Sequence, residues 1–179
     1  MSAGSRAQSV TRAQQATRAA CTVQWSAAHL YVREATGRND GPLIDTWARA
    51  NGVPLRSPWC GLTQWAGQKA CGLPVPKGAA GSYNWFLDPK RTYYVRGKRG
   101  SVDSLRAGHQ VGFYYANLGR IGHIGRGIVA GRTIRKGRPV RGWYVNAGNT
   151  GAGGGRDGAG IRLVYYALPD FYACANWLW

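Results

Sequence analysis

The sequence predicts an α+β domain in which N-terminal helices pack on an antiparallel sheet of about five or six strands. Helical spacing of apolar residues is confined to the part of the chain before Pro76. Beyond it, short segments rich in Val, Ile and Tyr are separated by glycine-containing turns, which is typical of successive antiparallel strands. Helices followed by strands is the order of an α+β domain, and 179 residues with 44% apolar content suffice for one core.

The chain is predicted to consist of a short arm and a single domain. Residues 1–16 are polar and rich in Ala, Gln, Ser and Arg, which indicates a flexible basic N-terminal arm, and residues 17–179 form the domain. The arm lacks the apolar region of a secretory signal, and no run approaches the roughly 20 apolar residues of a membrane span. We therefore expect a protein made in the cytoplasm without a signal peptide.

Three helices are predicted before the strands. The first covers "TRAACTVQWSAAHLYVREATG" and ends at Gly37, a residue type that favours helix termination. The second enters at Pro42 after a turn. The third takes Ser57 as its N-cap and Pro58 as its first residue, because proline lacks the N–H that would be unsatisfied there.

Five later segments carry the strand signal. They are "RTYYVRG", "HQVGFYYAN", "IGHIGRGIVAG", "GWYVNAGN" and "GIRLVYYAL". The run "GNTGAGGGRDGAG" before the last of them indicates a long loop or a wide hairpin. It lacks the Gly-Lys-Ser/Thr ending of a phosphate-binding loop, so nucleotide binding is not expected.

The charge is strongly positive. Lys and Arg number 24 against seven Asp and Glu, and thirteen of these cations lie between Lys90 and Arg141, where Asp103 is the only acid. A field of this strength attracts polyanions such as an anionic cell envelope, a nucleic acid or an acidic protein, and charge alone does not choose among them.

The four cysteines include no CxxC pair and no Cys/His cluster at zinc-finger spacing, so neither a metal site nor a cofactor is predicted. If disulfides form, Cys21 with Cys174 is the most plausible pair by elimination, although sequence does not establish connectivity. In a reducing compartment all four would be thiols. Cys71 is interpreted as a packing residue.

Cys60 is the candidate nucleophile. It falls in the first turn of the third helix, in "RSPWCGLTQWAGQKACGLP". Unpaired N–H groups and the positive end of the helix dipole stabilise a thiolate there, and the same N–H groups can hold an oxyanion. The alternative is a buried structural thiol, because free Cys is among the most buried residue types.

His123 is the candidate base. Strand alternation places Ile121 and Gly125 on its own face and Ile124 on the other, and the flanking glycines leave open space above the ring. Such an imidazole suits a group that reaches a thiolate. His29, in the first helix, is interpreted as a surface or packing residue.

A third polar group should accept the second N–H of the imidazole, as in Cys-His-Asn arrangements. "VNAGNT" supplies Asn149, with Asn146 as the alternative. Either residue can instead have a purely local role in a turn, where Asn is common.

Taken together, a helix-start "PWC", then "GHIG" about sixty residues later and "NAGNT" at the end of the next strand resemble the CHAP domain, the papain-like cysteine amidase and peptidase module of bacterial and phage cell-wall hydrolases. "REATGRNDGPLIDTWARANGVP" resembles the segment that precedes the nucleophile, and "SLRAGHQVGFYY" the strand that precedes the histidine. The resemblance runs from Glu34 to Leu168.

The resemblance implies a papain-like CHAP fold with Cys60 as nucleophile, His123 as general base and then acid, and Asn149 as the residue that orients the imidazole. The candidate substrate-binding residues are Trp59, Asn39 and Asp40. Two positions depart from the family pattern. Ala147 stands where a Glu is usual, and His109 replaces the Asp of a Pro-Gly-Asp turn.

The implied function is an endolysin-like peptidoglycan hydrolase that cleaves an amide bond of the stem peptide or cross-bridge. It would bind peptidoglycan and anionic envelope polymers, and act at the cell wall or periplasm after release by a pore protein or delivery by a virion or secretion system. The alternative is a non-enzymatic CHAP-like component of a larger assembly, whose basic surface binds nucleic acid or acidic partners.

Overall fold

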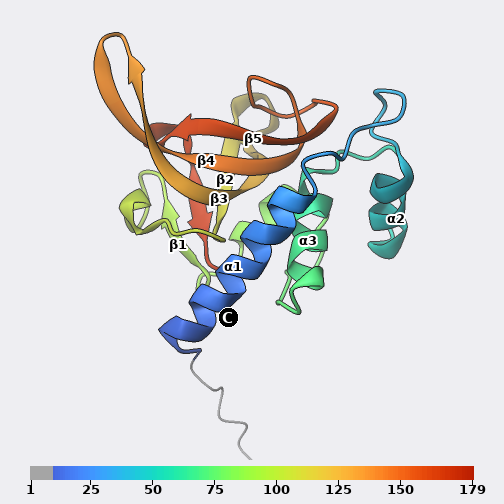
Figure 1. The fold of residues 1–179 in the computed structure, drawn as a ribbon, viewed down its shortest axis with the longest axis horizontal. Coiled ribbons are helices and arrows are strands. Elements are labelled where there is room, and N and C mark those ends of the chain that lie inside the picture. The colour runs from blue at the N-terminus through green and yellow to red at the C-terminus, as the bar shows by residue number, and fades with distance from the viewer. Residues whose placement is uncertain (1–9) are drawn as a thin grey trace, which may run out of the picture.

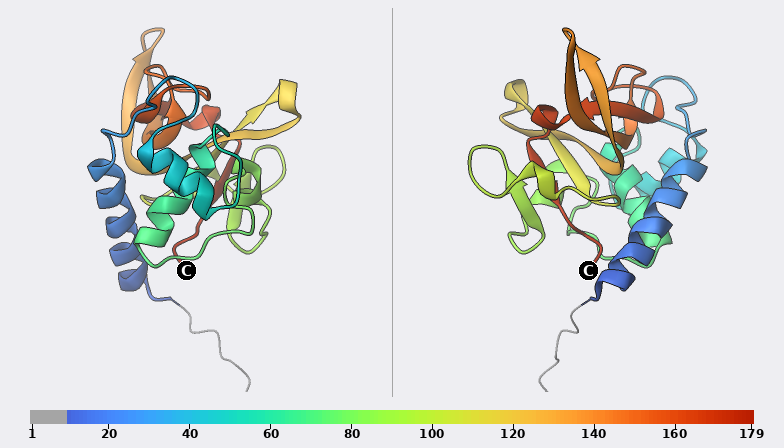
Figure 2. Two further views of the ribbon diagram at one scale, coloured as in Figure 1. Left: turned by 90° about the vertical axis from the view of Figure 1, so that its right-hand side faces the viewer. Right: turned by 60° about the vertical axis from the view of Figure 1, so that its left-hand side comes forward.

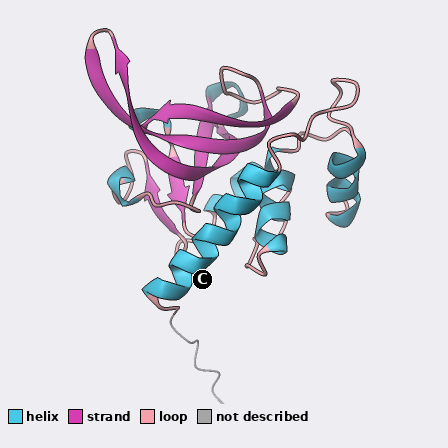
Figure 3. Ribbon diagram, viewed as in Figure 1, coloured by secondary structure: helices cyan, strands magenta, loops and turns pink. Residues whose placement is uncertain are grey.

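A computed structural model describes residues 10–179 as helices packed against a six-stranded antiparallel sheet, which confirms the predicted α+β class (Figures 1 and 3). The sheet order is β1-β6-β2-β3-β4-β5. The α-helices of this part of the chain are α1 (Arg12–Ala28), α2 (Pro42–Ala50) and α3 (Cys60–Ala70). The strands are β1 (Thr92–Val95), β2 (Gln110–Tyr115), β3 (Arg120–Arg135), β4 (Arg138–Thr150), β5 (Gly160–Ala167) and β6 (Ala173–Ala175).

Helix α1 begins earlier than predicted. The Thr11 hydroxyl accepts a hydrogen bond from the Gln14 amide at 3.2 Å, and the Gln14 side chain accepts one from the Thr11 amide at 2.8 Å. This capping box satisfies two backbone donors at the helix start. The prediction of an arm through residue 16 is therefore wrong for residues 12–16, and its first nine residues lie outside the described part.

Helix α1 also ends earlier, at Ala28 rather than at Gly37. The chain after it is extended beside β5. The carbonyl of Val32 accepts a hydrogen bond from the Ile161 amide at 3.1 Å, and the Glu34 amide donates to Ala159 at 2.9 Å. In this segment, hydrogen bonding to the edge of the sheet therefore outweighs the helical spacing of the apolar residues.

Helix α2 begins at Pro42 as predicted, whereas α3 begins at Cys60, two residues after Pro58. The predicted N-cap, Ser57, instead donates its hydroxyl to the Pro54 carbonyl at 2.7 Å, so the side chain is not available to cap α3. None of the described helices is both long and apolar enough to cross a membrane.

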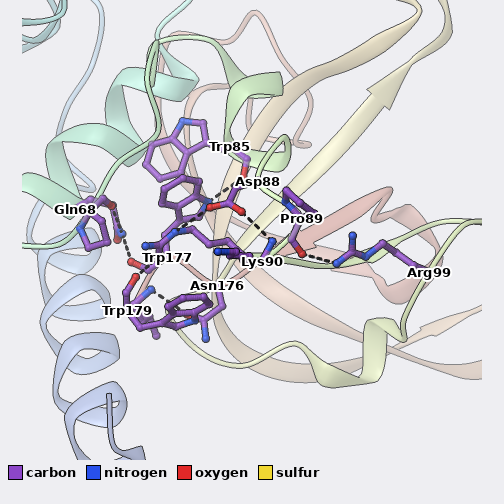
Figure 4. A network of polar contacts seen from close by, with 12 residues as sticks. Gln68, Trp85, Asp88, Pro89, Lys90, Arg99, Asn176, Trp177 and Trp179 are labelled. Atoms are coloured by element: carbon purple, nitrogen blue, oxygen red, sulfur yellow. Dashed lines mark hydrogen bonds and ion pairs between the residues drawn. The ribbon is translucent and has the colours of Figure 1, made fainter. Parts of the chain in front are cut away.

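All five predicted strands form, and β6 is a strand that the sequence pattern did not reveal. It lies between β1 and β2, and the chain after it folds back onto the core (Figure 4). The Trp177 indole donates to the Trp85 carbonyl at 2.8 Å, and Gln68 of α3 donates to the Trp177 carbonyl at 2.8 Å. Trp177 therefore belongs to this domain's own core, whereas Trp179 is 37% exposed.

A buried arginine joins the helices to the sheet. Arg126 of β3 is 1% exposed and donates hydrogen bonds of 3.2 to 3.4 Å to groups of α1 and α3. Its acceptors are the Thr22 and Gln64 carbonyls, the Ser26 hydroxyl and the Gln68 side-chain carbonyl. Burial lowers the pKa of the guanidinium to about 9, and no carboxylate of the described chain pairs with it.

A disulfide joins Cys21 of α1 to Cys71, just after α3. The predicted pairing of Cys21 with Cys174 is wrong, as is the interpretation of Cys71 as a packing residue. Helices α1 and α3 lie side by side on one face of the sheet, as the two views of Figure 2 also show. This packing brings Cys21 and Cys71 together. Cys174 is a buried free thiol on β6, packed with Val111 instead.

We expect Arg126→Ala to lower the free energy of unfolding by roughly 3–5 kcal/mol, because it leaves buried acceptors unpaired and opens a cavity. Arg126→Met fills most of the volume and is the matched control, with a smaller loss expected. Urea unfolding measures both. A loss below about 0.5 kcal/mol for Arg126→Ala, the size of an ordinary surface substitution, would contradict the role given to this residue.

We expect the native protein to contain one disulfide and two free thiols, Cys60 and Cys174. Because the disulfide closes a loop of 50 residues, reduction should lower the unfolding free energy by about 4 kcal/mol. Thiol counting by mass spectrometry and melting with and without reductant measure this. The double variant Cys21→Ser/Cys71→Ser should melt at the same temperature in both conditions, and four free thiols in the untreated protein would refute the pairing.

Candidate active site

Cys60 is the first residue of α3 and lies at the floor of a cleft of about 270 Å³. Its side chain is 4% exposed and packs in the same core cluster as Ile124 of β3. The walls of the cleft include Pro58 before the helix, Ser82 and Gly122. The structure therefore places the predicted nucleophile at the bottom of a concave site.

The surroundings of the sulfur act on its charge in two directions. Burial raises the pKa of the Cys60 thiol above its ordinary value, so the group is a neutral thiol at pH 7. The backbone amides of Ile124 and Gly61 and the positive charge of Arg156 lower that pKa. These donors are placed to receive the negative charge that develops when the thiol gives up its proton.

His123 lies on β3 opposite Phe113 of β2, with ring centroids 5.6 Å apart, and is fully buried. Burial first, and then the charge of Arg156, lower the pKa of the imidazole to about 4, so the ring is neutral at pH 7. Its Nε2 lies 3.1 Å from the Thr150 hydroxyl. That hydroxyl donates to the Gly148 carbonyl at 3.1 Å, so it accepts from Nε2–H. Nδ1 therefore carries the free lone pair.

The strand that carries His123 is irregular. The pairing of β3 with β2 shifts by one residue, which leaves Gly122 as an extra residue between Ile121 and His123. As a result Ile121 joins Ile124 in the core cluster that contains Cys60. The expectation that Ile121 shares the face of His123 is wrong, because regular alternation does not hold across a β-bulge.

The thiol and the imidazole are not hydrogen-bonded. Nδ1 of His123 is buried and has no hydrogen-bond partner in the described chain, while the backbone amide of the next residue along the strand, Ile124, lowers the pKa of the Cys60 thiol. The imidazole thus belongs to one residue of β3, and the next residue of the strand acts on the thiol. The imidazole shares its sheet face with Phe113, whereas the thiol packs among the residues of the helix-covered face.

The predicted orienting residue, Asn149, does not contact the imidazole through a hydrogen bond. Its amide is buried with neither atom paired, and its backbone has a left-handed φ of 54°. The β4–β5 pairing shifts between Ala147 and Thr150, so the irregularity lies at Asn149 and its neighbour. Thr150 makes the contact with His123 instead. Its position beside Asn149 in "NAGNT" was visible in the sequence, but the bulge was not.

Asn146 faces the helices rather than the cleft. Its side chain donates to the Ser26 carbonyl of α1 at 3.4 Å, and its own carbonyl accepts from Gln64 of α3 at 3.4 Å. This alternative third residue therefore connects the sheet to the helix layer.

The candidate substrate-binding residues lie away from the lining of the cleft. Trp59 is fully buried and donates its indole N–H to Glu34 at 2.8 Å. Asn39 donates to the Arg56 carbonyl at 3.3 Å, and Asp40 accepts hydrogen bonds within its own loop. In this structure Asn39 supports the segment that leads to the cleft wall, and Trp59 is a core residue.

Two arginines give the cleft a positive charge. Arg120 and Arg156 line it, and no acidic side chain of residues 10–179 does. Arg156 comes from the glycine-rich loop after β4, lies over the Tyr115 ring at 5.9 Å and pairs with Asp157 at 3.0 Å. Ala147, where a Glu was expected, is 1% exposed. The arrangement favours an anionic ligand beside a thiol.

Within residues 10–179, no three His, Cys, Asp or Glu side chains gather into a set that could hold a metal ion. Comparison of the chain with protein-family models, with curated proteins and with solved structures finds no match. The CHAP resemblance therefore stays a prediction carried by sequence motifs.

Buried histidines predict acid sensitivity. Burial, followed by the charges of Arg106 and Arg156, lowers the pKa values of His109 and His123 to about 4 each. Unfolded His titrates near 6.5. Between about pH 6.5 and 4 the unfolded chain therefore binds protons that the folded chain does not, and the unfolding free energy falls as the pH decreases through this window, by on the order of 3 kcal/mol per imidazole.

Urea unfolding at a series of pH values measures this dependence. His109→Gln/His123→Gln should flatten the profile between pH 6.5 and 4, and His29→Gln, which keeps both buried imidazoles, should not. A profile that is unchanged in the double variant would show that other groups cause the acid sensitivity.

Proposed function

We propose that this protein is a cysteine hydrolase that cleaves an amide bond of peptidoglycan, in the stem peptide or cross-bridge. The observation that carries the proposal is the position of Cys60, at the first residue of an eleven-residue helix and at the floor of a cleft. The backbone amides of Ile124 and Gly61 and the positive charge of Arg156 each lower the pKa of this thiol, against the larger opposite effect of burial. This is the environment that a developing thiolate and an oxyanion require.

His123 supplies the base. Its Nε2–H is held by Thr150, so Nδ1 presents its lone pair as the proton acceptor. Because the imidazole is neutral and the thiol is protonated at pH 7, the proton moves as attack occurs, rather than from a preformed ion pair. Because the two groups lie on opposite faces of β3, rotation of a side chain alone does not join them. The reaction therefore requires the start of α3 to shift against β3 until the sulfur meets Nδ1.

The chemistry then follows the order of thiol hydrolases. The sulfur bonds to the amide carbonyl carbon, the carbonyl oxygen becomes an oxyanion held by the amides at the start of α3, and His123 protonates the leaving amine. Water, deprotonated by the same imidazole, then hydrolyses the thioester and restores the thiol.

The charge of the cleft supports an acidic substrate. Arg120 and Arg156 can bind carboxylates of a wall peptide close to Cys60. The disulfide between Cys21 and Cys71 supports action in an oxidising compartment, as expected for the wall or periplasm. A pore protein, a virion or a secretion system would deliver such a protein.

A non-enzymatic binding component is the second candidate. The observation that favours it is that, in the described chain, the Cys60 thiol donates no hydrogen bond to the unpaired Nδ1 of His123. In that case the cleft and the basic surface would bind a partner without turnover.

We expect Cys60→Ser and His123→Gln to abolish the lysis of purified wall material. Both substitutions nearly keep the side-chain volume at these buried positions, so the variants should still fold and unfold cooperatively. Thr150→Val should lower the rate about 10- to 100-fold, because it removes the group that fixes the imidazole tautomer. Turbidity loss measures the rate, and mass spectrometry of soluble products identifies the bond. Asn149→Ala is the matched comparison at the neighbouring residue and should cost less than Thr150→Val.

Lysis that persists in Cys60→Ser would remove the enzyme assignment. A wild-type protein that binds wall material with no soluble product would favour the binding component. A larger loss of lysis rate in Asn149→Ala than in Thr150→Val would favour Asn149 as the residue that orients the imidazole, as the sequence predicted.

A further inference from the structure

Strands β3 and β4 continue beyond the sheet as an isolated two-stranded ribbon. They pair out to Arg135 and Arg138, whereas the pairing of β2 with β3 extends only to Arg126 and that of β5 with β4 only to Gly142. Residues 130–141, called here the β3–β4 ribbon, therefore have no neighbouring strand on either side within the described part of the chain. Figures 1 and 2 show this hairpin projecting beyond the rest of the molecule.

The ribbon is an exposed array of cations. Its exposed positive side chains are Arg132, Arg135, Lys136, Arg138 and Arg141. No acidic residue occurs between positions 120 and 150.

Two pairs of these cations face each other directly. Arg132 lies opposite Arg141 and Arg135 opposite Arg138, an arrangement that destabilises an isolated ribbon. Two acids from outside the ribbon reach one member of each pair, at 2.9 and 3.5 Å, but exposed bridges of this kind contribute little. Binding of an anionic ligand would remove this repulsion between the opposed arginines.

The cations occupy both faces of the ribbon. Directly opposed residues share a face and neighbours along a strand alternate, so one Arg–Arg pair lies on each face. Ile134, 67% exposed and opposite Pro139, shares a face with Arg132. The turn at Lys136 and Gly137 has positive φ at both residues, which gives a tight tip. An apolar side chain thus stands near the end of a charged arm.

We propose that the β3–β4 ribbon binds double-stranded DNA by entering a groove. The major groove admits a two-stranded ribbon, and guanidinium groups bind phosphate oxygens in a bidentate manner. Cations on both faces reach the phosphates of the two strands that flank a groove, while Ile134 contacts base edges or a base step. A flat anionic surface would meet only one face of the ribbon and leave the Arg–Arg pair on the other face unneutralised. The inference is independent of catalysis in the Cys60 cleft.

The test is fluorescence anisotropy with a labelled mixed-sequence duplex of about 20 base pairs over a series of salt concentrations. We expect Arg132→Gln/Lys136→Gln/Arg138→Gln to weaken binding at least about tenfold at 0.1 M salt and to reduce the salt slope by about one for each phosphate that is no longer neutralised. The matched control removes three exposed cations elsewhere, Arg49→Gln/Lys69→Gln/Lys77→Gln. It should weaken binding less than about threefold, because only the nonspecific field changes.

Four results would overturn the proposal. Three of them are no duplex binding by the full chain at 0.1 M salt, equal losses in the two triple variants, and displacement of the duplex by poly(glycerol phosphate) at the same phosphate concentration. The last would identify a wall-type polymer as the ligand. Ile134→Ser should weaken duplex binding without changing the salt slope, and unchanged affinity would exclude groove entry.

Wall lysis by the ribbon variants separates this inference from the proposed function. The variants should retain the Cys60-dependent rate, since none of the substituted side chains lines the cleft. A wild-type protein without lysis would count against the hydrolase and leave the DNA measurement valid.

Discussion

The fold depends on one buried guanidinium. Arg126 projects from β3 into the space between α1 and α3 and donates to both helices, with no carboxylate among its hydrogen-bond partners. Neutral oxygen acceptors must therefore offset the whole free-energy cost of removing the guanidinium from water. This requirement fixes the distance and the register of the two helices relative to β3. Gly67 shows how tight the site is, because a Cβ there would lie 2.7 Å from the guanidinium. The start of α3, and with it Cys60, is positioned by this contact.

The same strand connects the helix layer to the candidate chemistry. Arg126, Ile124 and His123 follow one another within four residues of β3, and each meets a different partner. Arg126 binds the helices, Ile124 presents its amide to the sulfur, and His123 points to the face where Thr150 holds it. The bulge at Gly122 makes this arrangement possible, since it changes the facing of residues before and after it.

The sequence predicted the helices and strands that have strong local signals. It did not predict features that depend on contacts between distant segments. Pro42, the periodicity after Cys60 and the Val- and Tyr-rich segments predicted elements that the structure contains. The catalytic roles of Cys60 and His123 also rest on local context and stay predictions, because the thiol and the imidazole form no hydrogen bond in the described chain. Thr150 was missed because its facing depends on a bulge next to Asn149. Arg156 was missed because nothing in a glycine-rich run specifies where its side chain will lie, and the disulfide because it depends on how two helices pack.

The position of β6 has a consequence for the order in which the sheet can form. Strand β6 is the last strand of the sequence, yet it lies between β1 and β2 and supplies the hydrogen bonds that join β1 to the rest. Residues 92 and 175 are paired across nearly half the chain. During synthesis, β2 to β5 can pair as successive neighbours, but β1 has no place in the sheet until residues 173–175 have left the ribosome. The sheet is therefore completed only once residues 173–175 are available, and a chain cut before them would expose the edge of β2 at the centre of the sheet.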